Sequence, residues 1–268
     1  MKLLVTNDGV VAENECFSTS FDVDNTVYEV LRVIDGIPLF VEDHYLRLSN
    51  SLWLQGYNYQ ISLSEFKKNI ETLILENNQA IGNVKFVCFV SKDEIKWVYY
   101  FIPHSYPTSE DYKSGITTDL LFAERNNPNA KVVQAELRTK ANQLMSDTKL
   151  YEVLLVNQDG LITEGSRSNV FFVKSEKFYT APTSMVLEGV TRQKVIQCIK
   201  KLNLKVEEQA VSFHFLSDFD AAFISGTSPK VLPIRFIGNQ QFNVCNEVVV
   251  QVMNEYNALI HNYISKQQ

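Results

Sequence analysis

Cysteine is scarce in this sequence, and long apolar runs are missing. The 268 residues include four cysteines, with no CxxC pair and no histidine at ligand spacing, which excludes a disulfide framework and predicts no metal site. We expect the cysteines to be reduced and to sit in apolar strands or helices. No apolar run approaches the ~18 residues of a membrane helix, and Asn7 and Asp8 interrupt the apolar start, unlike in a signal peptide. The sequence therefore predicts a cytoplasmic protein without a membrane partner.

Clusters of basic residues are missing as well. The formal net charge is −6, and lysine and arginine form no run, so a nucleic-acid partner is not expected. What is present is ordinary for a globular protein: 45% of the residues are hydrophobic and 21% are charged, enough to build a core. The length allows one large domain or two modest ones.

The first part of the chain predicts a small domain of strands and helices. Residues 26–34 are rich in β-branched side chains, and Asp35-Gly36 supplies the turn of a hairpin. Apolar residues recur at helical spacing over residues 42–55 and again over 64–76, where Ser64 is a partial cap. A second hairpin follows over residues 84–103, closed at Lys92-Asp93-Glu94.

A polar stretch that contains proline, HSYPTSEDYKS, separates this part from the rest. Beyond it, strands dominate, with a helix over residues 191–202 and a terminal helix that ends near Tyr263. We expect a mixed α/β fold of two domains. The predicted boundaries are a small α/β domain over residues 1–107, a linker over 108–118 and a larger, β-rich domain with helices over 119–268.

Lys131 stands in a context that suits a reactive amine. It follows the turn-forming Asn127-Pro128-Asn129 and enters the apolar pair Val132-Val133. A lysine held against apolar surroundings loses its proton more easily, as a Schiff-base lysine requires. Judged by this feature alone, a lysine with no chemical role, which merely lies at the start of a segment, is more frequent than a reactive one.

Three further segments combine charge or hydroxyl groups with glycine. In TEGSRSN, Glu164 enters an apolar strand, where a buried carboxylate needs a cationic partner. In LEGVTR, a loop opens a helix whose free N–H groups favour an anion, unless Thr191 merely caps the helix. ISGTS ends a strand with small hydroxyl residues, and Arg47 is the one distant guanidinium that suits a phosphate.

Together these segments resemble the class IV, or fold type IV, aminotransferases that depend on pyridoxal 5′-phosphate (PLP). That family includes branched-chain and D-amino-acid aminotransferases and aminodeoxychorismate lyase. The similarity covers most of the chain. It is strongest in DGLITEGSRSNVFFV, LEGVTR and SGTSPKVLP, and weaker in YEVLRVIDGIPLFVEDHYLRL.

The resemblance implies a role for each matching residue. Lys131 stands 33 residues before Glu164, the family's usual separation for the Schiff-base lysine, whereas Lys140 stands only 24 residues before it. Glu164 would pair with the pyridine nitrogen and keep the ring an electron sink. The implied phosphate cup consists of Arg47, Val190, Thr191 and Thr227. Leu187 is the implied apolar residue over the cofactor ring, and Asn169 is an implied supporting amide.

The implied activity is transfer of an amino group between an amino acid, branched-chain or of D type, and a 2-keto acid, with the freed amine of Lys131 as base and acid. The resemblance also implies a homodimer. Strand alternation places Tyr28, Val30 and Arg32 on one face beside the substrate pocket and Glu29 on the other, without showing which face looks inward.

The sequence departs from the family pattern at four places. The turn over residues 21–26 lacks the family's glycine, and residues 132–136 lack the tyrosine of branched-chain enzymes. Val30 replaces the threonine of the lyases, and residues 84–101 show no arginine pattern for a substrate carboxylate. Two alternatives therefore stay open beside the transaminase: a lyase of the aminodeoxychorismate type and a PLP-fold binding protein that has lost turnover.

Overall fold

The computed structural model describes residues 2–14, 26–57, 61–90 and 95–268. They form two compact units. The first holds residues up to 105 together with 130–135 and 261–268, and the second holds 106–129 and 136–260. The predicted division into residues 1–107 and 119–268 stays a prediction. Its linker, 108–118, contains the helix Ser109–Ser114 and the start of a strand.

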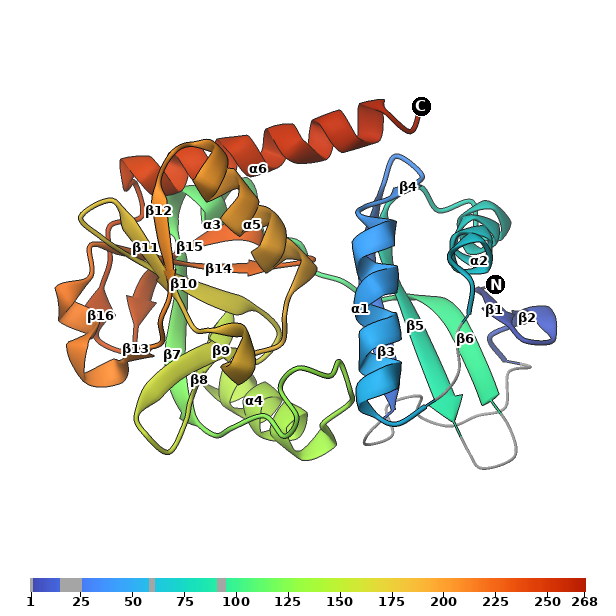
Figure 1. Cartoon of the computed structure of the whole chain (residues 1–268), viewed down its shortest axis with the longest axis horizontal. Coiled ribbons are helices and arrows are strands. Elements are labelled where there is room, and N and C mark those ends of the chain that lie inside the picture. Colours follow the sequence, from blue (N-terminus) through green and yellow to red (C-terminus); the bar gives the residue numbers. More distant parts are fainter. Residues whose placement is uncertain (1, 15–25, 58–60, 91–94) are drawn as a thin grey trace. The chain divides into compact units, whose positions relative to one another are not determined.

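The first unit is built on an antiparallel sheet with two helices packed against it (Figure 1). Its described strands run in the order β2-β1-β6-β5-β3-β4. The predicted Asp35-Gly36 turn closes the β3–β4 hairpin, and both residues have positive φ, 53° and 79°, as a tight hairpin turn demands. The elements are β1 (Leu3–Thr6), β2 (Gly9–Ala12), β3 (Val27–Ile34), β4 (Ile37–Pro38), α1 (Val41–Leu54), α2 (Leu63–Glu76), β5 (Gly82–Val90) and β6 (Ile95–Ile102).

Both predicted helices of this unit are confirmed, with one correction. The N-cap of α2 is Ser62, whose hydroxyl accepts a hydrogen bond from the amide of Glu65, and not Ser64. The glycine-free turn, of which residues 21–25 are not described, and the closing turn Lys92-Asp93-Glu94 of the second hairpin lie outside the described residues. The hairpin itself is present, because β5 pairs with β6 along its length.

The second unit holds a larger mixed sheet in the order β12-β11-β10-β14-β15-β7-β8-β9-β13, with β16 paired to β15. Its central strands are buried along nearly their whole length, which explains their continuous apolar runs. The strands are β7 (Ile116–Phe122), β8 (Glu152–Val156), β9 (Leu161–Gly165), β10 (Asn169–Lys174), β11 (Lys177–Thr180), β12 (Lys205–Glu208), β13 (Val211–Ser212), β14 (Ala221–Gly226), β15 (Lys230–Ile237) and β16 (Gln240–Gln241).

The helices of the second part of the chain include the two that the sequence predicted. They are α3 (Ser109–Ser114), α4 (Ala135–Thr148), α5 (Val190–Lys201) and α6 (Glu247–Ser265), with 3₁₀ turns at Thr183–Met185 and Phe213–Asp218. Within the described ranges, no helix combines the length and the apolar character needed to cross a membrane.

Three cysteines are described and all are free. Cys88 lies in β5 and Cys198 in α5, and burial raises the pKa of these thiols to about 12 and about 11, so both stay protonated at neutral pH. Cys245 does not follow the expectation of a buried position, because it lies exposed in the turn before α6.

Candidate active site

The predicted site residues divide between the two units. Lys131 belongs to the first unit, where residues 130–135 join the start of β3. The amide of Tyr28 donates to the carbonyl of Lys131 at 3.0 Å, and the amide of Val133 donates to that of Thr26 at 3.0 Å. The amide of Lys131 donates to the hydroxyl of Ser51 on α1 at 3.0 Å. The backbone of Lys131 is therefore held from two sides.

The side chain of Lys131 lies over an aromatic ring. Its Nζ is 4.6 Å from the centroid of the Tyr28 ring, and the Nζ of Lys85 is 5.1 Å from the same centroid. Tyr28, Val30 and Arg32 share one face of β3 by strand alternation. The Lys131 amine therefore lies beside the face that holds the three predicted substrate residues.

Arg47, the predicted phosphate ligand, is held by a buried carboxylate. Its Nε and Nη2 donate to Glu29 Oε1 and Oε2 at 2.8 and 2.7 Å, and Nδ1 of His44 is 2.8 Å from Oε2. Its carbonyl accepts from the same Ser51 hydroxyl that receives the Lys131 amide. Ser51 thus links the positions of Arg47 and Lys131.

Charge and burial act against each other in this cluster. Burial alone would raise the pKa of Glu29, but Arg47 and His44 outweigh it and lower the pKa to about 2. For His44 burial is the main cause of a lowered pKa; Glu29 opposes it, and the charges of Arg47 and Lys131 add to it. At neutral pH we therefore expect an ionised Glu29, paired with Arg47, beside a neutral His44.

Replacing Glu29 by Gln should lower the free energy of unfolding by about 3 kcal/mol at pH 7, because the cation of Arg47 loses its buried partner. The pKa of Glu29 is lower in the folded chain than in the unfolded one, so its contribution is complete above pH 4.5 and is lost as the pH falls towards 2. Denaturant titrations over this pH range should show that the difference in free energy of unfolding between the wild type and Glu29→Gln becomes smaller as the pH falls.

The control is Glu42→Gln, since Glu42 is 42% exposed and pairs with Lys67 at the surface. We expect it to cost less than about 1 kcal/mol. Equal losses for the two variants, or a Glu29 effect that does not change between pH 6 and pH 2, would contradict this description of the cluster.

In the second unit, Glu164 is a buried carboxylate near the end of β9. It is 2% exposed, its Oε1 accepts from Nε of Arg125 at 2.9 Å, and its Oε2 accepts from the amide of Leu187 at 3.3 Å. Arg125 also donates to the carbonyl of Ser166 at 3.4 Å. The sequence predicted a cationic partner for Glu164 but missed that Arg125 supplies one within this unit.

Leu187 and Asn169 are connected to Glu164. The side-chain amide of Asn169 donates to the carbonyl of Leu187 at 3.0 Å, and the amide of the same leucine reaches Glu164. A Cβ on Gly189 would lie 2.2 Å from Oδ1 of Asn169, so only glycine fits beside that side chain. Asn169, Leu187 and Glu164 thus form one hydrogen-bonded group.

The start of α5 has the properties expected of an anion site. Its N-cap is Gly189, with no side-chain cap, so the predicted alternative in which Thr191 caps the helix is wrong. Val190 and Thr191 form its buried first turn, where backbone N–H groups lack helical partners and the helix dipole favours negative charge.

The strand end that the sequence singled out lies beside Asn169. Ser225 of β14 pairs with Asn169 of β10 in the sheet register, and Thr227 follows in the turn to β15. The hydroxyl of Ser225 is buried without a hydrogen-bond partner. Such an orphan polar atom is costly unless a ligand or water satisfies it, which fits a bound phosphate.

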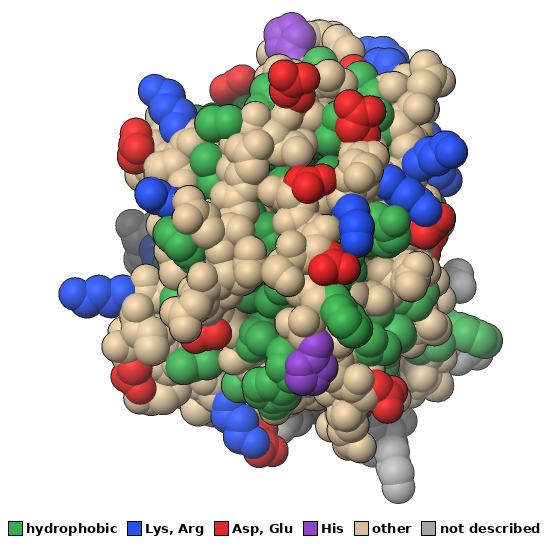
Figure 2. All heavy atoms as spheres, turned by 90° about the vertical axis from the view of Figure 1, so that its left-hand side faces the viewer, with side chains coloured by type: hydrophobic (Ala, Val, Ile, Leu, Met, Phe, Trp, Pro, Cys, Tyr) green, Lys and Arg blue, Asp and Glu red, His purple; other side chains and the backbone are tan. Residues whose placement is uncertain are grey.

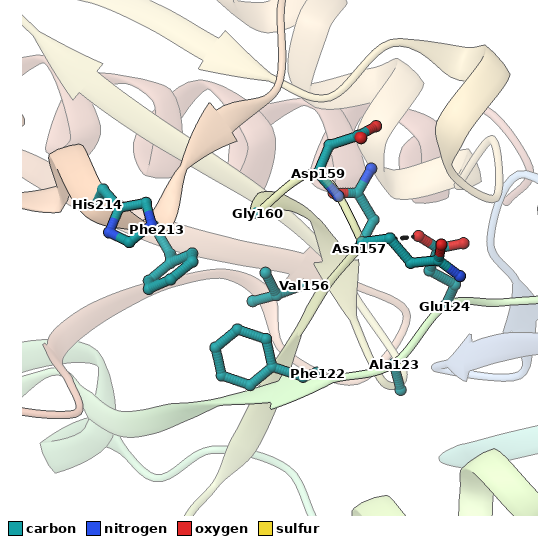
Figure 3. A pocket seen from close by; sticks show the side chains of 10 residues that line it. Phe122, Ala123, Glu124, Val156, Asn157, Asp159, Gly160, Phe213 and His214 are labelled. Atoms are coloured by element: carbon teal, nitrogen blue, oxygen red, sulfur yellow. Dashed lines mark hydrogen bonds between the residues drawn. The ribbon is translucent and has the colours of Figure 1, made fainter.

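A hollow of about 480 Å³ lies elsewhere in the second unit (Figure 3). Phe122, Val156 and Phe213 are among its lining residues, and Glu124 and Asp159 also border it. None of the predicted site residues lines it. Figure 3 shows the Phe122 and Phe213 rings on one side of the hollow and Glu124, Asn157 and Asp159 on the other.

Figure 2 draws one face of the second unit. Charged side chains of both signs are scattered over the face drawn there, with hydrophobic side chains between them. The part of the chain that the structure describes also holds no cluster of three or more side chains suited to a metal ion.

Comparison with known proteins places these features in a family. Residues 26–237 match the model of the amino-transferases of class IV. The chain belongs to this family of PLP-dependent enzymes. It is 29% identical over 257 residues to D-alanine aminotransferase of Bacillus licheniformis, covering 90% of this chain and 89% of that protein. It is 29% identical over 224 residues to a probable branched-chain-amino-acid aminotransferase of Thermotoga maritima, covering 82% of this chain and 80% of that protein.

Solved structures confirm the predicted fold, that of the fold type IV enzymes. The branched-chain amino acid aminotransferase of Escherichia coli matches with a TM-score of 0.84 at 22% identity, covering 97% of this chain and 94% of that one. A putative 4-amino-4-deoxychorismate lyase of Legionella pneumophila matches with a TM-score of 0.79 at 19% identity, covering 92% of this chain and 97% of that one. Another branched-chain amino acid aminotransferase, solved with pyridoxamine 5′-phosphate, matches with a TM-score of 0.82 at 20% identity, covering 98% of this chain and 95% of that one.

Proposed function

We propose that this chain is an aminotransferase that moves the amino group of a branched-chain or D-amino acid to a 2-keto acid, with Lys131 as the covalent anchor of PLP. The observation that carries this proposal is the placement of Lys131: its backbone is bonded to β3 and α1, and its amine lies over the Tyr28 ring. A fixed amine beside a strand of candidate substrate residues is what the reaction requires.

The residues present fit the cofactor. Glu164 offers a buried carboxylate for the pyridine nitrogen, and Leu187 an apolar side chain for the ring. For the phosphate, Val190 and Thr191 offer the uncapped helix start, and Thr227 follows the strand end with its orphan hydroxyl. Arg47 would add its guanidinium, and Asn169 would act through the carbonyl of Leu187. When bound, PLP withdraws electrons from the substrate Cα.

Lys131 would have two tasks in this proposal. Its Nζ holds the cofactor before substrate arrives, and once released it takes the proton from the substrate Cα as a general base and later returns a proton as an acid. The Tyr28 ring, whose centroid is 4.6 Å from Nζ, lies beside the amine and limits where it can move.

Tyr28, Val30 and Arg32 are the side chains that we propose border the substrate. The named relatives act on D-alanine or, as probable assignments, on branched-chain amino acids, and a strand face with an aromatic and a valine side chain suits small apolar substrates. Val30, in place of the threonine of lyases, favours transfer over elimination. We further propose that the enzyme is a homodimer, as the family resemblance implies, and that it works in the cytoplasm.

The test is a panel of L- and D-amino acids, each with 2-oxoglutarate or pyruvate, read by the absorbance of the bound cofactor and by keto-acid release. We expect turnover with D-alanine or with a branched-chain amino acid. Pyruvate release from aminodeoxychorismate alone would identify a lyase instead. A cofactor band that no amine donor shifts would leave a binding protein and contradict the proposal.

A further inference from the structure

Glu152, at the start of β8, is a buried carboxylate that the sequence did not single out. It is 4% exposed, and its described hydrogen-bond donors are all neutral. Oε1 accepts from the amide of Val153 at 3.0 Å and from the amide and hydroxyl of Ser166 at 3.2 and 2.6 Å. Oε2 accepts from the amide of Arg167 at 3.2 Å and the hydroxyl of Ser168 at 2.9 Å.

Four of these five hydrogen bonds come from three consecutive residues, 166–168. They form the turn that leads from Glu164 and Gly165 at the end of β9 to Asn169 at the start of β10. The turn packs so closely that a Cβ on Gly165 would lie 2.1 Å from the Ser168 hydroxyl and 3.1 Å from the Glu152 carboxylate. The turn is therefore wrapped around one carboxylate.

Both ends of this turn meet at Leu187. Glu164 accepts from the amide of Leu187, and Asn169 donates to its carbonyl. The segment from 164 to 169 and Leu187 thus close a ring of contacts. Glu152 receives four hydrogen bonds from the middle of this segment, beside the backbone bonds from the Gly165 amide to the Ser168 carbonyl at 2.7 Å and from the Ser166 amide to the Val153 carbonyl at 3.0 Å. A shift of the turn would move both partners of Leu187.

We propose that Glu152 is a positioning residue of the cofactor site, which holds the 166–168 turn and through it the carboxylate of Glu164 and the amide of Asn169. This inference rests on the proposed function. Glu152 is not itself proposed to touch the cofactor. It acts as a fixed acceptor around which the donors of the turn gather, so that the Glu164 carboxylate is in place before the cofactor binds.

Glu152→Gln is the direct test, because glutamine keeps the size but has one acceptor oxygen and one NH2 group. Either orientation of the amide points N–H groups at the donors of Ser166 or at those of Arg167 and Ser168. A loss of about 1.4 kcal/mol in the free energy that this network contributes corresponds to a tenfold change in an equilibrium constant. We expect the amide of residue 167 to exchange hydrogen at least about tenfold faster in the cofactor-free chain, and PLP to bind at least about tenfold more weakly.

Thr180→Val is the matched control, since Thr180 is equally buried, lies in the same unit and donates its hydroxyl to the carbonyl of Val170 at 2.8 Å. It should lower the melting temperature but leave the absorption maximum of bound PLP and its pH profile unchanged, whereas Glu152→Gln should move both. Ser168→Ala, which removes a donor instead of the acceptor, gives a smaller change of the same kind and serves if Glu152→Gln does not fold.

The outcomes separate the two proposals. Absence of PLP binding in the wild-type chain would overturn the proposed function and, with it, this inference. Wild-type binding, with a Glu152→Gln variant whose PLP affinity and cofactor spectrum match those of Thr180→Val, would overturn this inference alone. Unchanged exchange at residue 167 would do the same.

Discussion

Replacing Lys131 by Ala should lower turnover by about 10⁴-fold, the upper end of what a positioned general acid–base contributes. The substitution removes the only group proposed both to anchor the cofactor and to carry the substrate proton. The backbone bonds that hold this position stay, since the Tyr28 amide and Ser51 contact main-chain atoms. The loss should therefore appear in steady-state rates at a melting temperature close to that of the wild type.

Lys140→Ala is the control, because Lys140 lies exposed on α4, paired with Glu136, and is the competing lysine of the sequence motif. It should keep full turnover. If the two variants exchanged these results, the anchor would be Lys140 and the interval to Glu164 would have misled the prediction.

Replacing Glu164 by Gln should lower turnover by about 10²–10³-fold, the usual cost of losing one preorganised electrostatic contact to the reacting group. A neutral amide cannot stabilise a proton on the pyridine nitrogen as a carboxylate does. The measurement is a single-turnover rate with the preferred amino acid, together with the absorbance of the bound cofactor, so that weak binding is distinguished from slow chemistry.

The matched control is Glu124→Gln. Glu124 is exposed and accepts a hydrogen bond from the amide of Gln158 beside the hollow of Figure 3, so its loss should leave the rate unchanged. A Glu164→Gln variant as fast as this control would show that another residue, or none, holds the pyridine nitrogen.

Much of the fold follows from local rules that a sequence displays. Asp35-Gly36 is a hairpin turn because its two residues tolerate positive φ. The glycine of LEGVTR marks the start of α5 for a packing reason, since only Gly189 leaves room for Asn169. Even so, the start of α2 moved from Ser64 to Ser62, because neighbouring serines offer equally good caps.

The support of the site could not be predicted, because it depends on pairs distant in sequence. Arg125 reaches Glu164 across 39 residues, and Ser168 reaches Glu152 across 16. Neither pair has a motif. For His44 and Arg47 a weak signal existed, since they lie one helical turn apart on α1, but nothing local indicated that Glu29 would face both.

The motif residues themselves were predicted by resemblance and not by physics. A lysine before two valines and a glycine-rich turn with a glutamate are each common. The structure adds a physical reason for one of them: Val132 forms a bridge with Val27 at the start of β3, which brings the backbone of Lys131 next to Tyr28. That long-range pairing of a short segment has no periodic pattern from which it could be read.

The central claim is that the amine of Lys131 carries the cofactor. Borohydride reduction of the wild-type chain incubated with PLP, followed by proteolysis and mass mapping, tests it directly. We expect one stable phosphopyridoxyl adduct, on the peptide that contains Lys131, and its loss when a good amino-acid substrate is added before reduction. An adduct on Lys140, Lys85 or any other lysine, or no adduct at all, would contradict it.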